Sequence, residues 1–230
     1  MATVATPSLK IRSDDIFFPA MTFLMLGIVL TGFAKTYFLA GMMRAKLPNT
    51  LVHIHGFVFV LWIFLLVIQA LLVASHKVKW HMRLGVFSLI LLPSMFILGI
   101  LTLFDFVRRA AEDPLLVLIG DLETIAIFVA LASWGLLVRR DTTSHKRLMI
   151  LATMTIMGPA ISRWDIGVPA TLALILVLPL FVLVYDLWSL RRVARPTVVA
   201  NVLNLAWILT LMPVSKMVFW QRFIEWIRHP

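Results

Sequence analysis

Long apolar runs, separated by short polar stretches, occupy almost the whole chain. A helix that crosses a hydrocarbon core of about 30 Å needs about 20 mainly apolar residues. Seven stretches meet this requirement, near residues 16–41, 50–75, 82–104, 114–138, 146–163, 168–190 and 197–218. The connections between them are short, so consecutive helices should pack as antiparallel neighbours. The pattern predicts an all-α, polytopic transmembrane helical bundle in which residues 1–230 form a single domain.

The two ends of the chain differ from the apolar runs. The first 15 residues are polar, and the run that follows is longer than the apolar region of about 7–15 residues found in a signal peptide. We therefore expect a retained first span. At the other end, residues 217–230 alternate aromatic side chains such as Trp220 and Trp226 with charged ones such as Arg222. This alternation is typical of an amphipathic segment that lies in the membrane interface.

Composition agrees with a lipid environment. Hydrophobic residues make up 61% of the chain and charged residues 14%, whereas soluble domains average about 25% charged residues. The absence of cysteine excludes disulfides, thiolate metal sites and cysteine nucleophiles. A net charge of +10 would suggest nucleic acid in a soluble protein, but here the basic residues lie between apolar runs. They favour contact with anionic lipid headgroups, so the lipid bilayer is the expected partner and nucleic acid is not.

The distribution of Lys and Arg predicts an orientation, because basic residues accumulate in cytoplasmic loops. Twelve lie on the N-terminal side of the predicted spans and eight on the opposite side. The twelve are Lys10, Arg12, Lys77, Lys79, Arg83, Arg139, Arg140, Lys146, Arg147, Arg191, Arg192 and Arg195, and the eight are Arg44, Lys46, Arg108, Arg109, Arg163, Lys216, Arg222 and Arg228. We expect a cytoplasmic N-terminus and an external C-terminus.

Two consecutive helical hairpins carry similar polar residues. The first reads His53-Ile54-His55, then an apolar helix, then His81-Met82-Arg83-Leu84. The second reads Asp121-Leu122-Glu123, then an apolar helix, then His145-Lys146-Arg147-Leu148. The likeness indicates either an internal hairpin repeat produced by gene duplication or the loop chemistry that membrane helices commonly share.

Ionisable side chains at membrane depth are costly without partners or water, and they mark functional sites by default. The predicted topology places them in two groups, one near each face, with Gln69 in the inner part of the second span. The outer group is His53, His55, Asp121, Glu123 and Arg163, and the inner group is His81, Arg83, His145, Arg147 and Asp186.

Each group predicts a different kind of site. Imidazoles and carboxylates together suit divalent transition metals, so the candidate metal ligands at the outer end are His53, His55, Asp121 and Glu123. A haem needs one or two axial imidazoles from facing helices. The symmetric choice for those ligands is the pair His81 and His145. The alternative for both histidines is that they meet headgroups and cap helix ends.

Helical phase narrows the outer group. His53 and His55 are two residues apart, so they cannot both face one metal ion from a regular helix. His55, Trp62 and Gln69 follow one another at seven-residue intervals and so share one helix face, which makes His55 the better inward candidate.

His145 and Arg163 lie eighteen residues apart, so one continuous helix would place both on the same face. The expected supporting polar residues are Gln69, Arg83, Arg147, Arg163 and Asp186.

The residues from His53 to Asp186 resemble those of a family of uncharacterised bacterial seven-span integral membrane proteins. The resemblance is carried by Val52-His53-Ile54-His55-Gly56 with Trp62 and Gln69, His81-Met82-Arg83-Leu84-Gly85, Asp121, residues 145–153 from His-Lys-Arg-Leu-Met onward, Pro159-Ala160-Ile161-Ser162-Arg163 and Tyr185-Asp186-Leu187. It implies a multi-pass protein of the bacterial inner membrane. The His-Lys/Arg helix start is also similar to small membrane proteins that assemble haem-copper oxidases.

Three functions fit these residues. The first is binding of haem or a divalent transition metal in electron transfer or oxidase maturation. The second is transport of a small molecule or proton coupling, in which Asp121, Glu123 and Asp186 carry protons. The third is a cofactor-free membrane sensor or scaffold. The chain has no Gly-x-Ser-x-Gly, phosphate-loop or His-Glu-x-x-His motif, and its pattern does not decide whether it is an enzyme. Other membrane proteins or a second copy of the chain are the further candidate partners.

Overall fold

The computed structural model describes residues 12–39, 49–110 and 114–228, and these ranges are helical with no strand among them. Six helices are long and apolar enough to cross a membrane, which confirms the predicted all-α transmembrane bundle. They are α1 (Asp14–Gly32), α3 (Thr50–Ala74), α5 (Ser88–Arg109), α6 (Leu115–Leu137), α9 (Val168–Leu190) and α10 (Arg195–Ser215). The shorter elements are η1 (Ala34–Phe38), α4 (Val78–Gly85), α7 (Thr142–Thr155), α8 (Gly158–Ile161), η2 (Ser162–Trp164) and α11 (Val218–Arg228).

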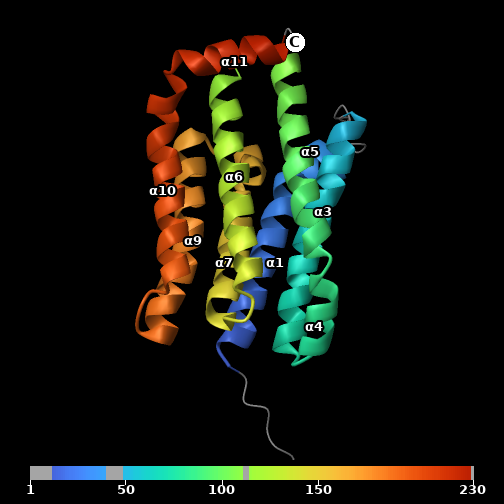
Figure 1. Cartoon of the computed structure of the whole chain (residues 1–230), viewed down its shortest axis with the longest axis vertical. Coiled ribbons are helices and arrows are strands. Elements are labelled where there is room, and N and C mark those ends of the chain that lie inside the picture. The colour runs from blue at the N-terminus through green and yellow to red at the C-terminus, as the bar shows by residue number, and fades with distance from the viewer. Residues whose placement is uncertain (1–11, 40–48, 111–113, 229–230) are drawn as a thin grey trace, which may run out of the picture.

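The long helices lie roughly along one axis, and α11 crosses one end of the bundle (Figure 1). The opposite end, where α1 begins, is called the N-terminal end below, and the end covered by α11 is called the α11 end. Contacts between distant residues fix the direction of each helix. The Tyr185 hydroxyl on α9 donates to Asp14 Oδ1 at 2.8 Å, so α9 finishes where α1 begins. The Trp207 ring on α10 donates to the Gly120 carbonyl near the start of α6, so these two helices are antiparallel.

The fifth predicted span, residues 146–163, is a chain crossing made of short helices rather than one long helix. At the N-terminal end Lys146 pairs with Asp14 at the start of α1. At the other end the Trp164 Nε1 atom donates to Thr31 Oγ1 near the end of α1 at 3.2 Å. The segment from α7 to η2 therefore runs parallel to α1 over its whole length. Together with the six long helices it gives the seven predicted crossings.

The break between α7 and α8 has a local cause. After Thr155, the last residue of α7, two residues intervene before Gly158 and Pro159 begin α8, and proline lacks the N–H that would continue the helix. In lipid, irregular backbone is tolerated only where protein surrounds it. This condition is met because α7 packs against α1, α6, α9 and α10, and eight of its residues are buried. The break also means that His145 and Arg163 do not share the face of a single continuous helix.

Two other span boundaries differ from the prediction. The first helix ends at Gly32 rather than continuing to residue 41, and the π-helix η1 follows it. The third predicted span, residues 82–104, is divided after Gly85 into α4 and α5. Glycine weakens a helix there, and the Ser88 hydroxyl turns back to the Gly85 carbonyl at 2.6 Å. Residues 1–11 of the polar N-terminal stretch lie outside the described residues.

The predicted interfacial tail forms α11. Its Ile224 and Ile227 side chains are buried against Leu118 and Ile119 of α6 and neighbouring residues of α5. The Arg108 side chain also donates to the Ile227 carbonyl at 3.0 Å, which ties α11 to the end of α5. The helix thus covers the α11 end and keeps an aromatic row on its other faces.

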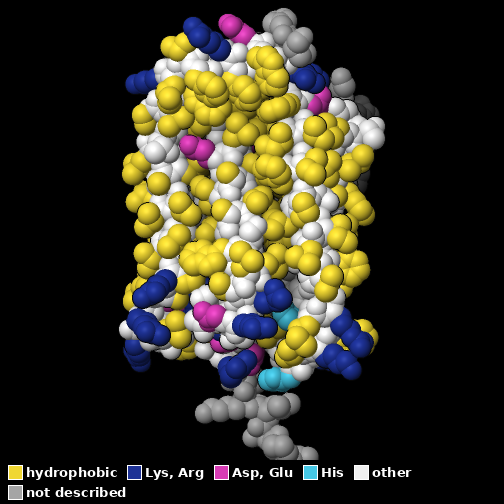
Figure 2. Space-filling model, viewed as in Figure 1, with side chains coloured by type: hydrophobic (Ala, Val, Ile, Leu, Met, Phe, Trp, Pro, Cys, Tyr) yellow, Lys and Arg dark blue, Asp and Glu magenta, His cyan; other side chains and the backbone are white. Residues whose placement is uncertain are grey.

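The surface is apolar around the middle of the bundle. Figure 2 shows hydrophobic side chains covering that region, while Lys and Arg gather towards the two ends. Large apolar residues are highly exposed there, such as Phe57 at 62% and Leu209 at 65%. A soluble protein would bury most of this area, so the exposed band and the six apolar helices together indicate a multi-pass membrane protein in a lipid bilayer.

The close approach of α1 to α8 generates a stability prediction. A Cβ atom added at Gly32 would lie 2.3 Å from the Ala160 carbonyl oxygen, whereas one at Gly27 meets nothing within 4 Å. We expect Gly32→Ala to lower the free energy of unfolding by about 1–3 kcal/mol through overpacking. Gly27→Ala should be neutral or slightly stabilising. Thermal unfolding in detergent, followed by tryptophan fluorescence, measures both, and equal melting temperatures would contradict the contact.

Candidate functional site

Two histidines from different hairpins meet near the N-terminal end of the bundle. His81 lies on α4 and His145 on α7, and their ring centroids are 6.2 Å apart with the ring planes at 82°. Sixty-four residues separate them along the chain. The two candidate haem ligands are therefore placed side by side by the fold.

His145 is held by the turn that joins α6 to α7. Its Nδ1 atom lies 2.8 Å from the Gly135 carbonyl oxygen on the last turn of α6. A carbonyl acceptor at Nδ1 fixes the tautomer with its proton on that atom, which leaves Nε2 with a free lone pair. The start of α7 is fixed by Asp141, whose carboxylate caps the backbone N–H groups of Thr143 and Ser144 at 3.1 and 3.2 Å.

His81 has an incomplete set of partners. Its Nδ1 atom is buried without a hydrogen bond within the described ranges, and both side-chain amide atoms of Gln69 are in the same condition. A Cβ added at Gly85, one turn after His81, would lie 3.5 Å from the Gln69 Nε2 atom, so the amide reaches α4. Burial lowers the pKa of His81 below its ordinary value of 6.5 and so favours the neutral ring, the form that binds metals.

A buried ion pair lies two residues beyond His145. The Arg147 Nε atom donates to Asp186 Oδ1 at 2.6 Å, and the two side chains are 1% and 0% exposed. The other oxygen, Oδ2, accepts from the Thr197 hydroxyl at 2.7 Å and from the Ala194 backbone N–H at 3.0 Å. One carboxylate thereby joins α7, α9 and the start of α10. The hydrogen bonds to both carboxylate oxygens offset part of the cost of burying both charges, while the Arg147 Nη2 atom is buried without a partner among the described residues.

A second ion pair anchors the start of α1 beside this network. Lys146 pairs with Asp14, whose other oxygen accepts from the Tyr185 hydroxyl at 2.8 Å. The Tyr185 ring stacks on Phe17 with centroids 3.8 Å apart. Arg83, a predicted supporting residue, instead turns to Trp80 on its own helix, with its guanidinium 5.4 Å from the ring centroid. Arg83 therefore forms no part of this network.

Near the α11 end, the structure separates the two histidines of the first hairpin. The His53 Nδ1 atom lies 2.8 Å from the Tyr37 hydroxyl of η1. The His55 Nδ1 atom lies 3.2 Å from the Thr102 hydroxyl of α5, and its ring stacks on Phe59. The two rings thus face different elements, as helical phase requires.

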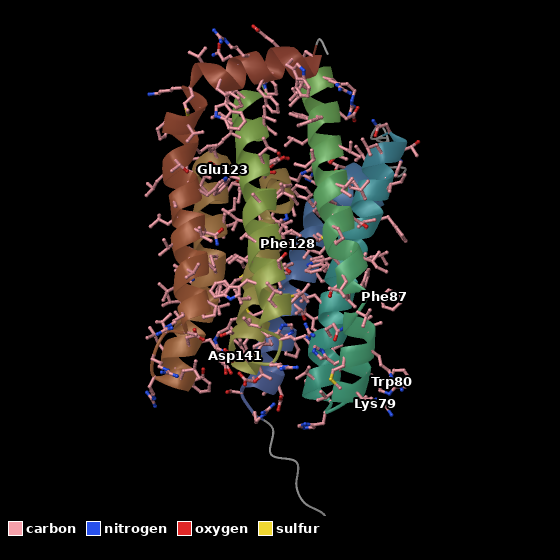
Figure 3. All side chains as sticks on the ribbon, viewed as in Figure 1. Lys79, Trp80, Phe87, Glu123, Phe128 and Asp141 are labelled. Atoms are coloured by element: carbon pink, nitrogen blue, oxygen red, sulfur yellow. The ribbon has the colours of Figure 1, made fainter. Side chains whose placement is uncertain are left out.

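The acids of the outer group also diverge. Asp121 is half-buried on α6. Glu123 lies on the side of α6 towards α10 (Figure 3), and its Oε2 atom is buried without a partner within the described ranges. No group of three or more His, Cys, Asp or Glu able to hold a metal ion occurs among the described residues. The predicted metal set of His53, His55, Asp121 and Glu123 is not assembled, because neighbours two residues apart point away from one another.

Several partners in the site come from residues that no sequence pattern marks. Gly135, Thr197 and Asp14 make the contacts described above, but each is an ordinary residue type at the end of an apolar run. The only signal for Asp14 is its place as an acid at the start of the first apolar run. Such contacts depend on which helices become neighbours.

The chain matches no protein-family model, no curated protein and no solved structure.

The cap of α7 generates a prediction about stability and pH. Hydrogen bonds from Ser144, through its hydroxyl and then its backbone N–H, lower the pKa of Asp141 below 3.8. We expect Asp141→Ala to lower the free energy of unfolding by about 1 kcal/mol at pH 7. Asp141→Asn should keep most of the stability that the cap contributes, because asparagine also caps helices. Because the folded-state pKa is depressed, the charge-dependent part is present above pH 4 or so and is lost as the pH falls through the folded value. Thermal unfolding of the three proteins between about pH 7 and 3 measures the difference. A gap that widens on acidification would contradict it.

The buried ion pair generates a second prediction. Asp186→Asn leaves the Arg147 guanidinium buried without a counter-charge, which should cost about 3–5 kcal/mol. Adding Arg147→Met removes that charge, while the asparagine amide oxygen can still accept from Thr197 and Ala194. The double variant should therefore melt at a higher temperature than Asp186→Asn alone. If the two substitutions destabilise additively, the pair is not the source of the effect.

Proposed function

We propose that this membrane protein binds haem between His81 and His145 and works in electron transfer or in the maturation of an oxidase. The meeting of these two rings, 6.2 Å apart, carries the proposal. In this arrangement the histidines supply the two axial ligands, and the cofactor when bound supplies one-electron chemistry. The remaining residues of the site position the two imidazole rings.

The separation of the rings suits two ligands on opposite sides of one iron. An imidazole nitrogen binds a metal at about 2.0 Å and lies about 1.1 Å from its ring centroid, so two opposed imidazoles have centroids about 6 Å apart. The observed separation is 6.2 Å. A tetrahedral pair would bring the centroids closer, to about 5 Å.

The number of available ligands favours haem over a bare metal ion. Protein sites for zinc or non-haem iron use three or four side chains. No third His, Cys, Asp or Glu joins the pair within the described part of the chain. A porphyrin brings four nitrogen ligands of its own, so two histidines complete the coordination.

Unsatisfied polar atoms around the pair also support a bound group. Buried polar atoms in folded proteins are nearly always hydrogen-bonded, and each exception needs an explanation. Three of the six such side-chain atoms in the described residues belong to His81 and Gln69, next to the proposed ligands. An iron ligand needs the lone pair of one ring nitrogen, and the Gln69 amide can orient a group held beside it.

Proton-coupled transport is supported less well by the same contacts. Asp186, one of the acids that could carry a proton, is committed to Arg147, Thr197 and Ala194 in a fully buried network. Releasing it would break that network. The proposed setting is the bacterial inner membrane, with the N-terminal end and its histidine pair on the cytoplasmic side, as the Lys and Arg count favours.

An absorption spectrum of the detergent-purified protein, produced with haem precursor, tests the proposal. We expect a Soret band and haem in stoichiometric amount with the chain. His81→Ala and His145→Ala should each reduce the bound haem at least tenfold, since each removes an axial ligand. Size-exclusion profiles and melting temperatures establish that the variants remain folded.

Two histidines elsewhere serve as matched controls. His53→Ala and His76→Ala should keep the full Soret band, because His53 pairs with Tyr37 and His76 lies in the turn after α3. Wild-type protein with no Soret band, or the same band in the double variant His81→Ala/His145→Ala, rules the proposal out. Metal analysis in the same preparation would then show whether the pair holds a bare ion.

A further inference from the structure

The short helix α4 has two unlike faces. Its inner face carries His81, whose ring meets His145, and Gly85, where an added Cβ would lie 3.5 Å from the Gln69 amide of α3. Its outer face carries Lys79 and Arg83, which are both exposed and lie four residues apart, so they are neighbours on the helix surface. Figure 3 shows Lys79 on the side of α4 that points away from the bundle.

The cations of α4 have no acidic partner among the described residues. None of the salt bridges there includes Lys77, Lys79 or Arg83, whereas Lys146, at the same end of the bundle, pairs with Asp14. Neither α3 nor α4 contains an Asp or Glu. The outer face of α4 therefore carries a positive charge that neighbouring side chains leave uncompensated, and an anionic group beside it would be stabilised.

The Arg83 side chain is held in a conformation that suits a phosphate group. Its guanidinium lies 5.4 Å from the centroid of the Trp80 ring, one turn back on the same helix. Stacking on an aromatic ring uses the flat face of a guanidinium and leaves the N–H groups at its edge free to donate. The Lys79 ammonium supplies a second cation on that face. The two side chains can thus donate to different oxygens of one phosphate.

The outer face becomes apolar as the chain enters the bundle. Val86, Phe87 and Ile90 follow Arg83, and all three are exposed. From Lys79 to Gly85 the helix rises about 9 Å, while the headgroup layer on each side of a bilayer is about 5–8 Å thick. Cations at headgroup depth are therefore followed by apolar side chains at acyl-chain depth. A phospholipid changes from phosphate to hydrocarbon in the same order.

We propose that the outer face of α4 binds one anionic phospholipid, with its phosphodiester between Lys79 and Arg83 and an acyl chain along Val86 and Phe87. A zwitterionic phosphatidylcholine suits the face less well, because its quaternary ammonium would lie beside uncompensated cations. Inorganic phosphate lacks the chain that the apolar residues contact. None of the residues of α4 is buried by the protein alone. The bound lipid therefore also covers the helix that presents His81 on its other face.

Native mass spectrometry of the whole protein, released from micelles that contain phosphatidylglycerol and phosphatidylcholine, tests this proposal. We expect one phosphatidylglycerol per chain to be retained in preference to phosphatidylcholine. Lys79→Gln/Arg83→Gln should raise the apparent Kd for phosphatidylglycerol at least tenfold, since each cation near a membrane surface contributes to anion attraction. Trp80→Ala should raise it about threefold, the effect of losing an exposed cation–π contact. If the double variant does not fold, Lys79→Gln and Arg83→Gln are measured singly and should each weaken binding.

The turn between α6 and α7 offers a matched control. Arg139→Gln/Arg140→Gln removes the same charge from two exposed residues at the same end of the bundle, next to Asp141. This control should bind phosphatidylglycerol as the wild type does. An equal loss in the control, equal retention of the two lipids by the wild type, or displacement of the lipid by inorganic phosphate each overturns the proposal. Lipid retention does not require haem, so an absent Soret band would remove the proposed function and leave this site standing.

Discussion

The fold depends on the buried contact between Arg147 and Asp186. The segment that carries it, α7, is only 14 residues long, and Gly158 and Pro159 begin a separate short helix two residues beyond its end, so it cannot cross the bilayer as a regular helix. In lipid such a break would expose unsatisfied backbone groups. The ion pair, completed by Thr197 and the Ala194 N–H, holds α7 among α1, α6, α9 and α10, where protein replaces lipid. Arg147 lies two residues after His145 on the same helix, so the pair also holds the helix that carries His145.

The polar chemistry of the molecule is divided between its two ends. Near the N-terminal end, His81 and His145 meet beside an unsatisfied Gln69 amide. Near the α11 end, His55 lies against Thr102 and Phe59, and Asp121 is half-buried on α6. The apolar layer around Trp62 and Phe128 lies between the two ends. Such a layer impedes the passage of ions and protons, because a charge is costly in a medium of low polarity. An electron-transfer protein with separate polar sites is compatible with it, whereas a continuous transport path is not visible among the described residues.

Sequence pattern located the helices well where one apolar run forms one helix. The run at 168–190 coincides with α9, and the run at 50–75 differs from α3 by a single residue. The sequence pattern was less accurate where an apolar run contains a break, as after Gly85 and between α7 and α8, because hydropathy does not register a turn that neighbouring helices surround. The pairing of His81 with His145 followed from comparing the two hairpins. The four residues of the predicted metal set do not form a metal-holding group among the described residues, since His55 and His53 point to different helices and Glu123 turns towards α10.

The sequence by itself determined the solvent and the approximate course of the chain. Apolar runs of about 20 residues in a chain with 14% charge leave a helical membrane bundle as the stable solution, since every backbone group must be satisfied within its own segment. Only the tertiary structure decided which polar side chains meet. Asp14 gains its role from Lys146 on a helix that is distant in sequence and adjacent in space. Gly135 and Thr197 gain theirs from partners on the next helix along the chain, across a turn. Apolar periodicity constrains the face that a helix buries, but it does not identify the helix on the other side of that face.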